Sequence, residues 1–205
     1  MTRFYRGMLL VISIFILQGC DQLTLNPVPV NGTILAFGDS LTYGVGVEES
    51  DSYPSVLATL TQREVINAGI SGEVSKDGLL RFEHELDEAQ PHLVILLEGG
   101  NDILRGHNLK QTKKNLAAMI QLAHQRDIQV LLIGVPEKKL FSKVAKLYPQ
   151  LAQEYELVLA DSLISSLLRS PEYKSDPIHF NEKGYNKMAH AIYDLLIKHK
   201  AIFND

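Results

Sequence analysis

Ser40 is the strongest candidate for a nucleophile in the sequence. It ends the segment 37–40, Phe-Gly-Asp-Ser, which follows an apolar run of strand length. A serine at a strand-to-helix turn can present its hydroxyl at the edge of a sheet, and the N-terminus of the following helix favours negative charge there. A serine before a helix is also commonly its N-cap, so this segment alone leaves a structural role open.

A second segment, Asp176-Pro177-Ile178-His179, supplies an acid and a base just before the last expected helix. The proline favours an extended conformation at Asp176, and the three-residue offset across such a bend can bring its carboxylate onto the imidazole of His179. The histidine could then act as a general base, with Asp176 holding its tautomer and stabilising the imidazolium. The other six histidines lack this arrangement.

Two glycine-containing loops could provide hydrogen-bond donors for an anion. Residues 67–73, Asn-Ala-Gly-Ile-Ser-Gly-Glu, follow the second apolar run, and backbone N–H groups in such a turn can bind an anion. Residues 98–102, Glu-Gly-Gly-Asn-Asp, follow the third run, where the glycines let the backbone approach a ligand and the Asn101 amide can donate. Either loop alone is typical of an ordinary turn, but the four segments in this order predict a single site.

The elements that must position these residues alternate between strands and helices from Thr33 onward. Apolar runs of strand length are separated by amphipathic segments, a pattern typical of a parallel sheet with helices on both faces. The expected strands are 34–37, 65–67, 93–97, 130–135 and 157–160. The expected helices are about 53–62, 75–89, 109–126, 142–155 and 181–198, the last with Asn181 as its N-cap. Such sheets bind ligands beyond the carboxyl ends of their strands. Three of the four segments follow an expected strand, and the fourth directly precedes the last expected helix.

The composition excludes several other classes of protein. The 205 residues are 45% hydrophobic and 21% charged, as expected for one globular domain with a substantial core. The formal charge of −4, without a basic cluster in the sequence, argues against nucleic acid as a partner.

The N-terminal segment has the features of an export signal. Residues 1–19 contain two arginines and then an uncharged apolar run, and they end just before Cys20, the single cysteine of the chain. The run is short for a bilayer span, which needs about 20 residues. With one cysteine, no intramolecular disulfide is possible. Residues 20–32, with two prolines and no helical or strand period, are expected to form a tether before a domain at 33–205.

The four segments together resemble the SGNH or GDSL hydrolases over nearly all of residues 33–205. They occur in the order found in that family: Gly-Asp-Ser at 38–40, Asn-Ala-Gly-Ile-Ser-Gly at 67–72, Gly-Gly-Asn-Asp at 99–102, and Asp-x-x-His at 176–179. The following Leu-Arg-Gly at 104–106 is similar to the bacterial thioesterase I, lysophospholipase L1 and arylesterase branch. The resemblance implies a three-layer α/β/α, flavodoxin-like fold with a five-stranded parallel sheet. It also implies a serine esterase for carboxylic esters or thioesters that needs no metal or organic cofactor.

The resemblance assigns roles to particular residues. Ser40 would be the nucleophile, and His179 with Asp176 would be its activating pair. The oxyanion hole would be formed by the backbone N–H groups of Ser40 and Gly72 and by the side-chain amide of Asn101.

The resemblance extends to the N-terminal segment. Cys20, which follows Leu-Gln-Gly, resembles the lipidated cysteine of bacterial lipoproteins. Lipidation would attach the domain to a membrane of the cell envelope, facing the periplasm, whereas the alternative is an uncleaved hydrophobic anchor. Asp21 resembles the signal that keeps lipoproteins in the inner membrane of enteric bacteria.

Four residues depart from the family pattern. Pro177 and Phe180 stand where Gly and Pro are more frequent, Glu73 stands where Asp is frequent, and His107 stands where the branch often has an aromatic residue. The catalytic set is intact, and the acyl-chain preference is left open. The segment after Pro136, Glu-Lys-Lys-Leu-Phe-Ser-Lys, is expected to border the substrate groove, with a solvated helix start as the alternative.

Two functions of other classes remain compatible with the sequence. A lipid-tethered binding protein could use the same sheet edge as a ligand cradle without chemistry. A metal-dependent phosphoesterase could use Asp39, Asp102, Asp176 and His179 as ligands. Among esterases, aryl esters, acyl thioesters, lysophospholipids and acetylated envelope sugars all present the same carbonyl, so the sequence leaves the substrate open.

Overall fold

Strands and helices alternate along the chain in the computed structural model, which describes residues 23–137 and 143–203. In chain order the elements are β1 (Thr33–Gly38), α1 (Ser40–Tyr43), the 3₁₀ turn η1 (Glu49–Asp51), α2 (Tyr53–Thr61), β2 (Glu64–Gly69), α3 (Ser75–Ala89), β3 (Leu93–Leu97), α4 (Gly100–Arg105), α5 (Leu109–His124), β4 (Gln129–Ile133), α6 (Leu147–Glu154), β5 (Val158–Ala160), α7 (Leu163–Arg169), the 3₁₀ turn η2 (Pro171–Tyr173) and α8 (Glu182–Lys198).

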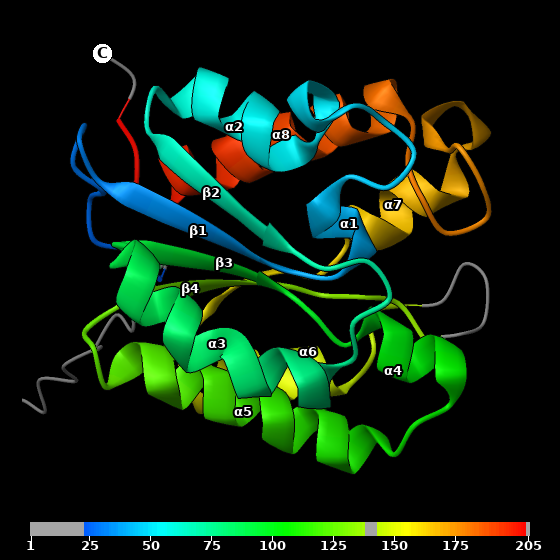
Figure 1. Cartoon of the computed structure of the whole chain (residues 1–205), viewed down its shortest axis with the longest axis horizontal. Helices are drawn as coiled ribbons and strands as arrows, with labels where there is room; N and C mark the ends of the chain where they lie inside the picture. The colour runs from blue at the N-terminus through cyan, green and yellow to red at the C-terminus, as the bar shows by residue number, and fades with distance from the viewer. Residues whose placement is uncertain (1–22, 138–142, 204–205) are drawn as a thin grey trace, which may run out of the picture.

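One five-stranded sheet runs through the domain in the order β2-β1-β3-β4-β5, and every neighbouring pair is parallel. In the middle of the sheet, Ile34 of β1 pairs with Val65 on one side and with Leu93 on the other. All carboxyl ends therefore lie at one edge, on the right of the view in Figure 1. The predicted five-stranded parallel α/β fold is confirmed.

Helices cover both faces of this sheet. The α1, α2, α7 and α8 helices lie on one face, and α3, α5 and α6 lie on the other (Figure 1). Because successive strand residues point to opposite faces, β1 places Ile34 and Ala36 in one hydrophobic cluster and Leu35 and Phe37 in the other. The strands β1, β3 and β4 are apolar at nearly every position because both of their faces are buried.

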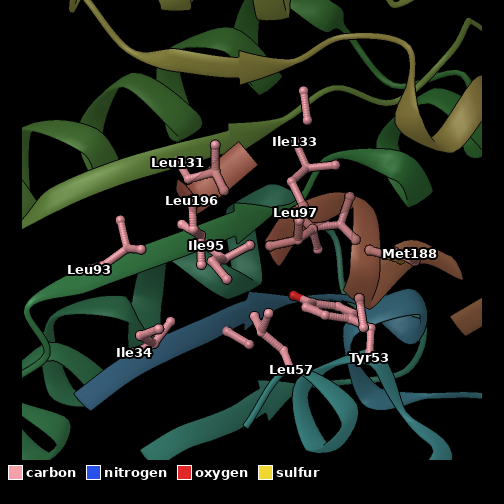
Figure 2. Close-up of a cluster of buried hydrophobic side chains, with 14 of the residues drawn as sticks. Ile34, Tyr53, Leu57, Leu93, Ile95, Leu97, Leu131, Ile133, Met188 and Leu196 are labelled. Carbon is pink, nitrogen blue, oxygen red and sulfur yellow. The ribbon is translucent and has the colours of Figure 1, made fainter. Parts of the chain in front are cut away.

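Figure 2 shows the cluster on the first of these faces. Tyr53 and Leu57 of α2, together with Met188 and Leu196 of α8, pack against strand residues such as Ile95, and all five side chains are fully buried. This packing fixes α8 against the sheet and, with it, the loop that precedes α8.

Most predicted elements begin and end within two residues of the observed ones. The helix expected at 142–155 is different, because α6 begins only at Leu147. Before it, the N–H of Ala145 donates to the carbonyl of Val135 (2.9 Å), which holds this part of the chain beside the end of β4. Asn181 is the N-cap of α8, as predicted, and its side chain accepts from the N–H of Gly184 (3.0 Å).

The segment from Leu23 to Gly32 forms no helix or strand, as its composition predicts, but it packs on the domain. Leu25 and Val28 are buried, with 9% and 2% of their surface exposed. Cys20 and Asp21 lie outside the described residues. Within residues 23–137 and 143–203, no helix is long and apolar enough to cross a membrane.

Candidate active site

Ser40 lies where β1 ends and α1 begins, at the carboxyl edge of the sheet. Gly38 ends the strand so close to β3 that a Cβ atom there would lie 2.0 Å from the carbonyl oxygen of Leu97, so the turn requires glycine. The side chain of Asp39 accepts from the N–H of Leu41 (3.1 Å), which makes Asp39 the N-cap of α1. The capping role considered for Ser40 is therefore wrong, and its hydroxyl makes a different contact.

That contact is with the imidazole of His179, 139 positions away in the sequence. Ser40 Oγ lies 3.0 Å from His179 Nε2, and His179 Nδ1 lies 2.6 Å from Asp176 Oδ2. The other carboxylate oxygen of Asp176 accepts from the N–H groups of Ile178 and His179, both at 2.8 Å. The structure thus brings the three residues predicted for nucleophilic catalysis into one hydrogen-bonded chain.

Asp176 is held in its ionised form by these contacts. Partial burial acts to raise its pKa, but the hydrogen bonds from the His179 ring and from the N–H groups of Ile178 and His179 outweigh it, so the pKa is lower than usual. A carboxylate facing Nδ1 keeps the proton of the neutral imidazole on that nitrogen. Nε2 is then an acceptor aimed at the Ser40 hydroxyl.

Gly72 and Asn101, the other predicted donors, flank the serine from two different elements. Gly72 follows β2 with a φ of +79°, a backbone conformation that favours glycine. Asn101 lies in the first turn of α4, and its Nδ2 donates to the carbonyl of Glu73 (2.9 Å) and, more weakly, to Asp39 Oδ2 (3.4 Å). Because Glu73 follows Gly72 and Asp39 precedes Ser40, these hydrogen bonds join the three donors in one neighbourhood.

The segment from Gly72 to Ser75, which we call the donor loop, is held by two further contacts from α4. Arg105 Nη2 donates to the carbonyl oxygen of Gly72 (2.8 Å). The buried carboxylate of Asp102 accepts from the N–H and the hydroxyl of Ser75 (2.7 and 2.8 Å) and from the hydroxyl of Thr112 (3.0 Å). Sequence reasoning missed these roles, because neither charge nor spacing indicates that an arginine will bind a particular backbone carbonyl.

Glu73, the residue that departs from the more frequent Asp, ties the donor loop to α3. Arg81 Nη2 lies 2.6 Å from Glu73 Oε2 and also donates to the carbonyl of Ala68 (2.8 Å). The guanidinium of Arg81 stacks over the ring of Phe37, 4.0 Å from its centroid. The donor loop is therefore fixed to α3, to β2 and to α4.

Two buried carboxyl groups, Asp39 and Glu98, lie behind the site. Glu98 Oε1 accepts from the N–H of Gly99 (3.0 Å), whereas Oε2 has no hydrogen-bond partner among the described residues. Burial and then the charge of Asp39 raise the pKa of Glu98 well above its ordinary value, and burial raises the pKa of Asp39 to about 6. Burial and the charge of Asp39 therefore both favour the protonated form of Glu98.

A largely apolar cavity of about 300 Å³ opens beside these residues. Its apolar walls come from α1, α4, α7 and the end of β4, and include Leu41, Ile103, Leu104, Val135, Ile164 and Leu168. Ser40 and Asn101 also line it, so the cavity reaches the nucleophile and one of the donors. Pro136 and Glu137 lie on its wall, as expected for the segment after Pro136, while residues 138–142 are outside the described part.

The residues considered for a metal-dependent phosphoesterase do not form a ligand set. The carboxylate of Asp102 binds Ser75 and Thr112, while that of Asp176 faces His179. Across residues 23–137 and 143–203, no group of three His, Cys, Asp or Glu side chains is arranged to hold a metal ion. The arrangement fits nucleophilic catalysis by serine better.

Comparison with known proteins agrees with this geometry. The GDSL-like Lipase/Acylhydrolase family model matches residues 36–187. Thioesterase 1/protease 1/lysophospholipase L1 of Escherichia coli (strain K12) is 31% identical over 157 residues, 73% of this chain and 76% of that protein. The arylesterase of Vibrio mimicus is 32% identical over 177 residues, 81% and 88% of the two chains. The crystal structure of AlinE4, an SGNH-hydrolase family esterase, matches with a TM-score of 0.66 and 31% identity, covering 82% of this chain and 96% of that one. The chain therefore belongs to the GDSL-like lipase/acylhydrolase family and is an esterase of the SGNH type.

Proposed function

We propose that the protein hydrolyses carboxylic esters or thioesters through an acyl intermediate on Ser40. The observation that carries the proposal is the hydrogen-bonded chain from Ser40 through His179 to Asp176 beside an apolar cavity. His179 Nε2 accepts the hydroxyl proton as Ser40 Oγ attacks the carbonyl carbon, and Asp176 stabilises the imidazolium that forms. The imidazolium then protonates the leaving alcohol or thiol. In the second half-reaction, His179 activates a water molecule that releases the acid.

The negative charge that develops on the carbonyl oxygen is met by three donors. These are the backbone N–H groups of Ser40 and Gly72 and the side-chain amide of Asn101. The Asn101 hydrogen that faces Asp39 makes the weaker of its two contacts, at 3.4 Å, and it is the one that turns to the substrate. Removal of one such donor typically costs about 2.7 to 4 kcal/mol of transition-state stabilisation.

The cavity beside Ser40 holds the acyl chain. Its apolar walls favour hydrocarbon, and its volume of about 300 Å³ exceeds what an acetyl group needs. The cavity therefore supports aryl esters or thioesters of longer acids over acetylated envelope sugars. The two relatives are named for substrates of these classes: one is a thioesterase and lysophospholipase, and the other is an arylesterase. A binding protein without chemistry would have no use for the contact between His179 and Ser40.

The proposal includes attachment to a bacterial envelope membrane through a lipid on Cys20, with the domain on the periplasmic side. The apolar run that ends just before this cysteine supports it. Asp21 supports retention in the inner membrane, because an aspartate directly after the lipidated cysteine resembles the retention signal of enteric lipoproteins. Cys20→Ala should move the protein from the membrane to the soluble fraction with its esterase activity unchanged, and a membrane-bound Cys20→Ala variant would refute the lipid anchor.

The test of the enzymatic proposal compares two hydroxyl residues that line the same cavity. Ser40→Ala should reduce hydrolysis of 4-nitrophenyl butyrate to the uncatalysed rate, because it removes the attacking oxygen. Ser165→Ala is the matched control, since Ser165 lines the cavity but donates to the carbonyl of Ser162 (3.0 Å). Turnover by Ser40→Ala at the native rate would refute the assignment of the nucleophile.

A further inference from the structure

The segment from Leu23 to Gly32, which we call the strap, is fixed to the end of the domain opposite Ser40. The N–H of Leu25 donates to the carbonyl of His199 (2.7 Å), and the N–H of Val28 donates to the carbonyl of Ala201 (2.8 Å). Both side chains are buried in the hydrophobic cluster that contains α8. The strap is therefore part of the folded domain, and the chain is held in place from Leu25 onward.

The position of the strap along the sheet is set by contacts with the starts of strands. The amide of Gln129, the first residue of β4, binds the backbone of Asn26 at both its N–H and its carbonyl, each at 2.7 Å. Arg63 Nε, one residue before β2, donates to the carbonyl of Val28 (3.0 Å). In Figure 1 the strap lies on the left, while α1, α4 and α7, which line the cavity, lie on the right. An anchor that precedes the strap is therefore attached at the edge of the sheet where the strands begin, whereas the site opens at the edge where the strands end.

The length of chain between Cys20 and Leu25, the first residue of the strap whose backbone N–H is bound by the domain, limits how the domain can turn. Residues 20–24 span at most about 17 Å when fully extended, because each residue reaches about 3.3 to 3.6 Å. A compact domain of about 180 residues has a radius of gyration near 16 Å and so a diameter of about 40 Å. To face the bilayer with its cavity, the domain would have to place the strap about 40 Å above the lipid headgroups, more than twice the reach of these residues.

We propose that the cavity faces away from the membrane that carries the anchor, so that the substrate is a carboxylic ester presented from the aqueous side and not an ester embedded in that bilayer. The proposal rests on the esterase activity and the anchor proposed above. A carboxylic ester can be presented from the aqueous side or from the anchoring membrane, and the proposal assigns the substrate to the aqueous side. Acyl esters in water, or carried on polymers of the envelope, reach Ser40, whereas lipids of the anchoring membrane do not.

The test presents one reacting group in both locations. Full-length protein is reconstituted into phospholipid vesicles and given an aryl butyrate either dissolved in water or linked to the headgroup of a phospholipid in the same vesicles. A variant carries about 50 Gly/Ser residues between Gln22 and Leu23, which give the tether a root-mean-square reach of about 40 Å. The matched control carries the same insert after Asp205, where it does not change the tether.

The native chain and the control should hydrolyse the membrane-linked ester at least about tenfold more slowly than the tether variant, because a linker that cannot span two sites gives an effective concentration near zero. All three should hydrolyse the dissolved ester at the same rate. Equal rates of native chain and tether variant on the membrane-linked ester would overturn the proposal, as would a native chain that does not bind the vesicles. Failure of all three chains on the dissolved ester would instead refute the esterase function, and with it this inference.

Discussion

Arg105 offers a test of how the donor loop is held, because its guanidinium touches the loop through one hydrogen bond. Arg105 Nη2 donates to the carbonyl of Gly72 at 2.8 Å, and Arg105→Ala removes that bond alone. The loop keeps its contacts from Asn101, Asp102 and Arg81, so the variant should fold normally. The Gly72 N–H should then be less well aligned with the oxygen that becomes charged in the transition state.

The size of the effect follows from the nature of the bond. A hydrogen bond to a charged group contributes about 1.5 to 3 kcal/mol, and the exposure of Arg105 places it at the lower end of that range. A loss of about 1.4 kcal/mol corresponds to a tenfold lower rate. Because the alignment matters for the transition state and not for the bound substrate, kcat should fall about tenfold with KM little changed.

The assay is steady-state hydrolysis of 4-nitrophenyl butyrate over a range of concentrations. Arg105→Lys should recover part of kcat, since lysine restores a positive donor without the planar fork of arginine. Arg126→Ala is the matched control, because this surface arginine binds Glu83 and Asp87 rather than any residue of the site. A higher KM with unchanged kcat would show that Arg105 contacts the substrate, and unchanged kinetics would show that the bond to Gly72 has no catalytic role.

Three further predictions concern stability. Gly38→Ala should lower the free energy of unfolding by about 3 kcal/mol in urea titrations, because its Cβ would lie 2.0 Å from Leu97 O. Gly106→Ala, with a φ of +70° but no atom within 4 Å of the added Cβ, should lose only about 1 kcal/mol, and equal losses would refute the steric argument. Glu98→Gln should match the native chain below pH 4.5, the ordinary pKa of the group, and should be the more stable of the two at higher pH, because the native chain loses stability once its unfolded state ionises while the buried Glu98 keeps its proton; equal stability of the two chains across the pH range would contradict the raised pKa. Because burial raises the pKa of Asp39 from 3.8 to about 6, the native state binds the extra proton and its stability falls by about 3 kcal/mol as the pH rises through that window. Asp39→Asn, which keeps a capping oxygen, should remove that part of the pH dependence, and an identical pH profile would contradict it.

Most of the fold could be predicted from the sequence because the sheet is buried on both faces. The run from Leu93 to Leu97 is apolar at every position and forms the strand expected there. The α4 helix was not expected, because it has six residues and begins at a glycine, too short for an apolar period to show. The packing of the strap was also not visible, since its prolines predict only the absence of a helix or strand.

The predicted residues of the site follow strands or precede the last helix, and parallel strands bring such positions to one edge. This is why Ser40 and His179 could be placed together from order alone. The supporting contacts depend on tertiary geometry that a sequence does not encode locally. Arg105 binds a backbone carbonyl. Glu98 looks like any polar residue after a strand until the structure shows that it is buried and that one of its oxygens has no hydrogen-bond partner within residues 23–137 and 143–203.

The most direct test of the account is the identity of the residue that an aryl alkylphosphonate modifies. The native protein should lose its ester hydrolysis in proportion to the phosphonyl group it gains, and peptide mass spectrometry should find one group per chain, on Ser40. His179→Ala should react far more slowly, because the proton acceptor 3.0 Å from Ser40 Oγ is gone. Modification of another residue with full loss of activity, or activity that survives complete modification of Ser40, would contradict the account.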